Sequence, residues 1–138
     1  DSKLEIAPSA RILQGGGVLV AAAVDAPERA KMLAAAGAEV LVLPNPAGKV
    51  ELKDLLEELG RRGINEIHAE AGFKLNGSLL REGLVDEFLL YLAPCLVGHA
   101  AAGLFNLPEL ASLDGRQRLQ IRDLRLVGQD LRLIARPA

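Results

Sequence analysis

The residues best suited to chemistry lie in one short stretch, where a carboxylate is followed by a glycine and a lysine. Glu70 ends an apolar segment, Gly72 interrupts it, and Lys74 comes just before a predicted helix. In α/β proteins, ligands bind beyond the carboxyl ends of the strands. A helix N-terminus offers unpaired N–H groups and a partial positive charge, which suit a phosphate. The stretch therefore predicts an anion-binding crevice into which Glu70 points a carboxylate.

A plainer interpretation explains the same residues. An ordinary strand–loop–helix connection, with a solvated glutamate and a solvated lysine, has this composition too. The stretch does not match the pattern GxGxxG, and a single glycine-containing loop is a weak signal. Gly72 and Gly77 would let a ligand approach the backbone closely, but the pattern alone leaves both interpretations open.

A second pattern imitates a zinc site. His68, Glu70 and Cys95 resemble the H-x-E…P-C-x-x-C signature of zinc deaminases, but Gly98 stands where the second cysteine should be. A catalytic zinc site uses three protein ligands, and pairing Cys95 with His99 would not match the signature. We therefore predict no metal site, and we interpret His68 as a packed strand histidine and Cys95 as a small apolar residue.

The composition restricts the class of protein. The chain has 138 residues, of which 50% are apolar and 25% charged, as in one ordinary globular domain. Its net charge of −2 and its lack of basic runs argue against nucleic-acid binding. One cysteine excludes an internal disulfide. No apolar stretch approaches the ~20 residues of a membrane span and no signal peptide opens the chain, so we expect a cytoplasmic protein.

Apolar runs and periodic leucines alternate along the chain. The predicted strands cover residues 18–24, 40–43, 64–70, 87–94, 119–127 and 130–136, and the predicted helices 27–36, 52–59 and 76–82. Alternating strands and helices indicate a parallel sheet with helices on its faces. The last two strands are separated by two residues, Gly128 and Gln129, which predicts an antiparallel hairpin.

The second predicted helix has a clear apolar side. Leucines at positions 52, 55, 56 and 59 share one helical face. On the outer face, the pairs Glu57–Arg61 and Glu58–Arg62 have the i,i+4 spacing of helical ion pairs.

Several segments together resemble one known family. They are residues 63–72 (GINEIHAEAG), 75–80 (LNGSLL), 83–87 (GLVDE), 91–94 (YLAP) and 127–133 (VGQDLRL). They resemble the reductase domain of bacterial bifunctional riboflavin biosynthesis proteins, the RibD family. The resemblance implies a dihydrofolate-reductase-like, three-layer α/β/α fold with a mostly parallel sheet and a C-terminal antiparallel hairpin. It also implies that residues 1–138 form one domain, the C-terminal portion of such a reductase, whose amino-terminal part is absent.

The resemblance further implies an activity and its residues. The family reduces 5-amino-6-(5-phosphoribosylamino)uracil to the ribitylamino compound with NADPH. Glu70 matches a glutamate that contacts the substrate, and no proton donor is assigned. The positions implied in NADP binding are Ser2, Gly72, Phe73, Lys74, Leu75, Asn76, Gly77 and Ser78. Phe73 and Lys74 depart from the Pro-Thr of many members. We expect residues 1–138 alone to be poorly active or inactive.

Two other functions remain open from the sequence. The chain could be a non-catalytic ligand-binding or dimerisation module of the same fold, because a fold alone never fixes a function. It could also reduce another pterin-like or pyrimidine-like substrate. We expect a homodimer, and for the non-catalytic module strand 87–94 and the terminal hairpin could form its interface.

Overall fold

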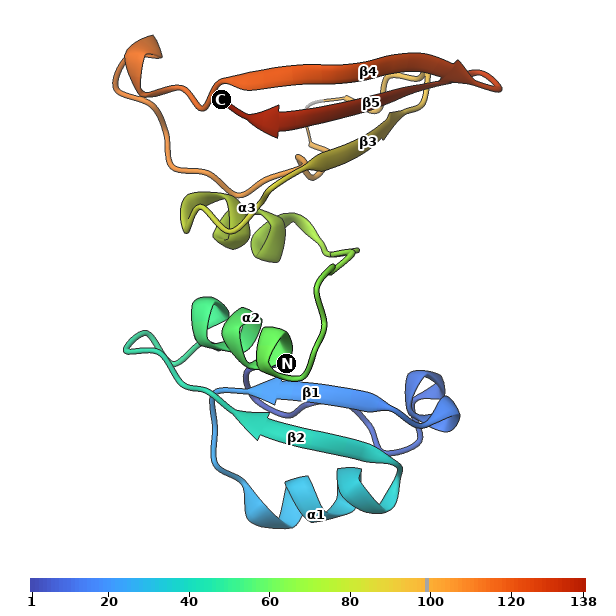
Figure 1. The fold of residues 1–138 in the computed structure, drawn as a ribbon, viewed down its shortest axis with the longest axis vertical. Helices are drawn as coiled ribbons and strands as arrows, with labels where there is room; N and C mark the ends of the chain where they lie inside the picture. Colours follow the sequence, from blue (N-terminus) through green and yellow to red (C-terminus); the bar gives the residue numbers. More distant parts are fainter. Residues whose placement is uncertain (99) are drawn as a thin grey trace. The chain divides into compact units, whose positions relative to one another are not determined.

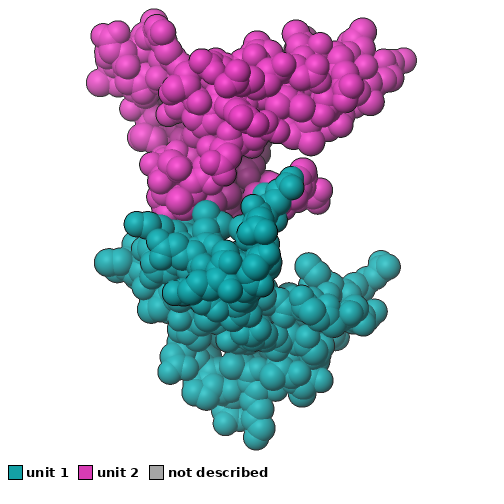
Figure 2. All heavy atoms as spheres, viewed as in Figure 1, with its two compact units in different colours: residues 1–67 teal, residues 68–138 magenta. Residues whose placement is uncertain are grey.

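A computed structural model of the protein describes residues 1–98 and 100–138. Their contacts group into two compact units, residues 1–67 and 68–138 (Figure 2). We describe each unit by itself, and the single domain over residues 1–138 stays a prediction. No helix of the described residues is long and apolar enough to cross a membrane.

The first unit is a small α/β/α arrangement. Strands β1 (Val18–Ala22) and β2 (Ala38–Val42) pair in parallel, and α1 (Pro27–Ala35) connects them. Helix α2 (Leu52–Arg61) follows, and in Figure 1 it lies on the opposite side of the two strands from α1. A short 3-10 helix, Arg11–Gly15, precedes β1.

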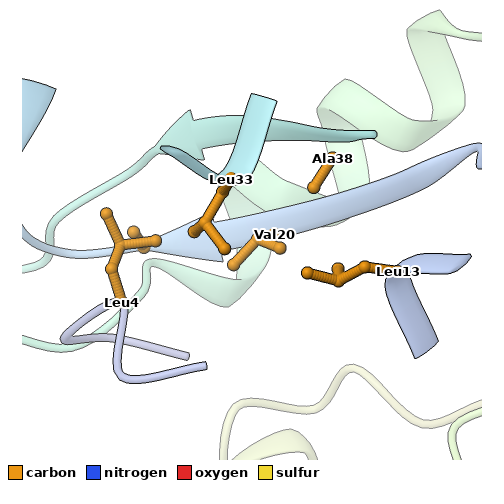
Figure 3. Packing of buried hydrophobic residues seen from close by; sticks show 6 residues of the cluster. Leu4, Leu13, Val20, Leu33 and Ala38 are labelled. Carbon is orange, nitrogen blue, oxygen red and sulfur yellow. The ribbon is translucent and has the colours of Figure 1, made fainter. Parts of the chain in front are cut away.

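The core of this unit contains only aliphatic side chains. Figure 3 shows leucines from the first residues, from the 3-10 helix and from α1 meeting the small side chains of the strands. Its buried members are Leu4, Leu13, Val20, Ala22, Leu33 and Ala38. Because the chain has 3% aromatic residues and no tryptophan, close packing of small side chains replaces the large apolar area that aromatic rings would bury.

The first residues are fastened to the carboxyl end of β1. The N–H of Ala23, just after β1, donates to the carbonyl of Ser2 at 2.9 Å. The Arg29 side chain donates from Nε to the carbonyl of Leu4 and from Nη2 to that of Ile6, each at 2.9 Å. Leu4 is buried at a φ of +54°, which is uncommon for a side chain of this kind. Burial and the arginine therefore hold a strained turn in place.

Helix α2 is anchored by an arginine at its carboxyl end. The predicted pair of Arg62 with Glu58 is confirmed at 2.8 Å, and Arg62 also binds both carboxylate oxygens of Glu39 at 2.7 Å. The predicted pair of Arg61 with Glu57 is not formed. Arg61 pairs with Glu58 instead, at 2.8 Å. These contacts connect the end of α2 with β2.

The second unit combines the α-helix α3 with an antiparallel sheet (Figure 1). Its elements are α3 (Phe73–Arg81), β3 (Phe88–Leu92), the 3-10 helix Leu113–Gly115, β4 (Leu119–Val127) and β5 (Asp130–Pro137). The sheet has the order β3-β5-β4, with every pair antiparallel. The predicted hairpin is confirmed, and Gly128 turns it with a φ of +63°, a conformation that glycine adopts without steric cost.

The α/β class is confirmed, but the parallel part is smaller than predicted. Residues 64–70 form no strand, so in the described residues the parallel pairing is that of β1 with β2. The large apolar side chains of residues 64–70 are those of Ile64 and Ile67, and both are exposed. A spacing of three would put them on opposite faces of a strand, so neither face would be apolar. Helix α3 begins at Phe73, earlier than the predicted 76.

The contacts of Arg62 make the stability of the protein depend on pH. Hydrogen bonds from Arg62 lower the pKa of both Glu39 and Glu58. A lowered pKa in the folded state adds stability above the unfolded value of about 4.3, and this contribution is lost as the pH falls. We predict that the free energy of unfolding falls less steeply from about pH 6 to about pH 3 in Arg62→Gln than in the wild type.

Urea denaturation across this range measures the difference. Lys53→Gln, which removes an exposed cation of the same helix, should keep the wild-type slope. Parallel curves for the wild type and Arg62→Gln would contradict the assignment.

Candidate functional site

The predicted substrate residue is in an open position. The Glu70 side chain is 86% exposed, and its Oε1 lies 3.7 Å from Nε2 of His68. His68 is itself 68% exposed, so its interpretation as a packed strand histidine is wrong. The reason is the missing strand over residues 64–70, which leaves both side chains in a solvated segment. Glu70 is therefore accessible to a ligand, as a substrate contact requires.

The amino end of α3 has the features of an anion site. Gly72 is its N-cap, in extended conformation and without a side-chain cap, and the first intrahelical bond runs from Asn76 N–H to the Gly72 carbonyl at 3.1 Å. The N–H groups of Phe73, Lys74 and Leu75 precede that bond, so the helix itself gives them no acceptor. Across residues 1–98 and 100–138, no hydrogen bond of the structure uses them either.

The surroundings of these amides suit a negative charge. Residues 72–75 are all exposed, so a ligand can reach the backbone. The positive end of the helix dipole lies here, and Lys74 adds a full cation within the first turn. The predicted residues Gly72, Phe73, Lys74 and Leu75 thus form one accessible surface that can bind a phosphate.

Gly77 and Ser78 lie deeper. Gly77 is buried, and a Cβ built on it would lie 2.7 Å from the backbone nitrogen of Asn106 and still closer to that residue's carbonyl oxygen. The absence of a side chain at Gly77 therefore lets the backbone of Asn106 come close to the helix. Ser78 Oγ accepts from Arg81 Nη2 at 3.0 Å. Cofactor contacts at these two residues stay a prediction.

Ser2 lies in the other unit. Its carbonyl accepts the N–H of Ala23, which places it at the carboxyl end of β1, where ligands of parallel sheets bind. Ser2 belongs to the first unit and residues 72–78 belong to the second. Its contact with the same cofactor stays a prediction.

A cleft in the first unit lies elsewhere. It is lined by the beginnings of β1 and β2 and by the end of α2, and its lining residues are Gly17, Val18, Leu19, Gly37, Glu39, Leu59, Arg62 and Ile64. Its charged side chains, Glu39 and Arg62, bind each other. The cleft is at the amino ends of the strands, opposite to the end where ligands of such sheets bind.

The zinc-like pattern is not assembled in the described residues. Within residues 1–98 and 100–138, no three His, Cys, Asp or Glu side chains are grouped as metal ligands. Cys95 is exposed, which corrects its interpretation as a packed apolar residue, because β3 already ends at Leu92. His99, the alternative ligand, lies outside the described residues.

Sequence reasoning missed the residues that hold α3. The N–H of Asn106 donates to the Phe73 carbonyl at 3.0 Å, and Arg81 Nη1 donates to the Asn106 carbonyl. A Cβ built on Gly103 would lie 3.7 Å from Cε2 of Phe73. The available signal was Gly77. A glycine inside a helix lowers the stability of the helix, so its presence can indicate that another segment packs closely against it.

The chain resembles known proteins over most of its length. The family model described as "RibD C-terminal domain" matches residues 1–133. The riboflavin biosynthesis protein RibD of Haemophilus influenzae is 44% identical over 86 residues, which are 62% of this chain and 23% of that protein. The 5-amino-6-(5-phosphoribosylamino)uracil reductase of Buchnera aphidicola is 35% identical over 89 residues, 64% of this chain and 43% of the relative.

A solved structure extends the comparison to the whole chain. RibD of Acinetobacter baumannii superposes with a TM-score of 0.85 at 28% identity, covering 100% of this chain and 36% of that one. The chain thus spans less than half the length of each of these relatives and shares the fold of the matching part of the solved structure.

The two helix-interior glycines provide a matched test of the packing at α3. Gly77→Ala places a methyl group against the backbone of Asn106, so we predict a loss of about 1–3 kcal/mol in the free energy of unfolding. Gly60→Ala in α2 meets nothing within 4 Å and should add about 0.5–1 kcal/mol through helix propensity. Chemical denaturation measures both, and a stabilising Gly77→Ala would contradict the described contact.

Proposed function

The chain belongs to the RibD C-terminal domain family, and on this basis we propose that it is the reductase part of a riboflavin biosynthesis enzyme. The proposed reaction is the NADPH-dependent reduction of 5-amino-6-(5-phosphoribosylamino)uracil to its ribitylamino product. A relative that carries the name of this reductase supports the proposal. The observation that carries it in this chain is the exposed amino end of α3 beside Glu70.

The residues at α3 fit a nicotinamide dinucleotide phosphate. Its phosphate groups would accept hydrogen bonds from the N–H groups of Phe73, Lys74 and Leu75, and the ammonium of Lys74 would neutralise part of their charge. Gly72 leaves the approach to these amides open, since nothing lies within 4 Å of a Cβ built there. Ser2 is the proposed contact from the first unit. When bound, NADPH supplies the hydride.

Glu70 is the proposed contact for the substrate. Its carboxylate can accept hydrogen bonds from the amino and ring N–H groups of the aminopyrimidine. The carbon to be reduced is C1 of the ring-opened ribosyl group, a C=N carbon that gains one hydride while its nitrogen gains one proton. The protein contributes mainly by holding the two partners in reacting geometry. The cytoplasmic location predicted from the sequence is part of this proposal.

We further propose that the chain forms a homodimer through its C-terminal sheet. One face of the hairpin is apolar, because Ile121, Leu124 and Leu126 stand opposite Ala135, Leu133 and Leu131 in the register. A β-bulge between Ile121 and Asp123 keeps these side chains on one face despite their uneven spacing. The three side chains of β4 are 62%, 53% and 71% exposed, and an apolar surface of this kind commonly marks an interface.

The proposed roles of Glu70 and Lys74 separate in steady-state kinetics. We predict that Glu70→Gln raises the KM for the pyrimidine about 10–100-fold, as expected for a hydrogen bond to a charged group. It should leave the KM for NADPH near its wild-type value. Lys74→Ala should raise the KM for NADPH, more strongly at low salt than at high salt, and should leave the KM for the pyrimidine near its wild-type value. Oxidation of NADPH followed by absorbance measures both constants.

Lys31→Ala on α1 is the matched control and should change neither KM. Where turnover by residues 1–138 is too slow, titration calorimetry with each ligand gives the same comparison. Equal effects of both variants on both ligands, or no binding of NADPH by the wild type, would contradict the assignment.

The proposed dimer depends on the apolar face of β4. Leu126→Glu introduces a charge at its most exposed leucine, and we predict that it shifts the sedimentation coefficient from the value of a dimer to that of a monomer. Ile12→Glu, at a similarly exposed position in the first unit, should leave the dimer intact. A wild-type protein that sediments as a monomer would overturn this proposal.

A further inference from the structure

Residues 103–106 bind to α3 near its amino end. The N–H of Asn106 donates to the carbonyl of Phe73, the first residue of the helix, at 3.0 Å. In the other direction, Asn76 Nδ2 donates to the carbonyl of Leu104 at 3.3 Å. Gly77 lets the backbone of Asn106 come into direct contact with the helix. We call residues 103–106 the strap.

Two side chains of α3 complete the attachment. Asn76 Nδ2 also donates to the carbonyl of Ala71 at 3.0 Å, just before the N-cap Gly72, so it fixes the path by which the chain enters the helix. Arg81, at the other end of the helix, donates from Nη1 to the Asn106 carbonyl and from Nη2 to Ser78 Oγ. The strap is therefore attached to α3 at both its first and its last turn.

We infer that Asn76 and Arg81 are positioning residues, which hold the strap on α3 and so keep the amides of residues 73–75 ordered for a phosphate. A helix of nine residues is marginal on its own in water, and its ends fray. Frayed amides lose their common direction, and a ligand must then restore it at the expense of its affinity. The inference rests on the proposed function, because the ligand is the cofactor named there.

This inference changes the role expected of Asn76. Its side-chain amide has two hydrogens, and the carbonyls of Ala71 and Leu104 accept both. The donors are thus committed to the protein, so Asn76 acts on the cofactor through the backbone that it orders. The exposed amides of Phe73, Lys74 and Leu75 remain the groups that contact the phosphate.

Asn76→Leu tests the inference. Leucine is similar in size and favours a helix more than asparagine does, so a loosened helix end would result from the missing donors. We expect hydrogen exchange at the amides of residues 76–78 to become at least about tenfold faster. The Kd for NADPH should rise at least about tenfold, while the Kd for the pyrimidine stays within about twofold.

Two further variants keep the test decisive. Arg81→Met retains the stem but removes both guanidinium donors, so it should change exchange and Kd in the same direction even if Asn76→Leu does not fold. Asn65→Leu replaces an exposed asparagine outside α3 and should match the wild type. Wild-type exchange and wild-type Kd in both α3 variants would overturn the inference.

The exchange measurement also separates this inference from the proposed function. It is made on the ligand-free protein, so it decides whether the strap orders α3 even if NADPH does not bind. Failure of the wild type to bind NADPH would remove the proposed function. Unchanged hydrogen exchange in the α3 variants would contradict the role of the strap in ordering α3.

Discussion

The packing of α3 in the second unit depends on one backbone contact. Gly77 brings the helix backbone of α3 against the backbone of Asn106, an approach that no residue with a Cβ allows. The hydrogen bonds of Asn76, Arg81 and Phe73 with the strap all require this short separation. The orientation of the first turn of α3, and with it the direction of its free amides, follows from this contact.

The first unit also depends on close packing, but there it is the packing of small side chains in the core. Its core has no aromatic side chain, so small aliphatic residues must pack closely, and Leu4 accepts a strained backbone to be buried there. The planar guanidinium groups of two arginines add further hydrogen bonds. Arg29 donates to backbone carbonyls, and Arg62 donates to carboxylates. The N–H of Ala23 holds Ser2 at the carboxyl end of β1, the end where a parallel sheet binds its ligands.

Local patterns predicted local structure well. The paired strands β1 and β2, helix α2 and the terminal hairpin were all found from apolar runs, leucine spacing and a two-residue turn. The strand predicted over residues 64–70 is wrong. Ile64 and Ile67 are three residues apart and do not have the two-residue alternation of a half-buried strand. The helix that follows Glu70 was predicted, but the strap that packs against it was not. Its contacts join residues about thirty positions apart, and no local pattern records such a pairing.

The most direct measurement of the central claim is an NMR titration of the ¹⁵N-labelled protein with NADPH. We predict that the largest chemical-shift changes fall on the backbone amides of Phe73, Lys74 and Leu75. The amides of Glu28 and Arg29, at the start of α1, should change little although they also begin a helix. Saturable binding that perturbs α1 or the sheet and leaves the start of α3 unchanged would contradict the account.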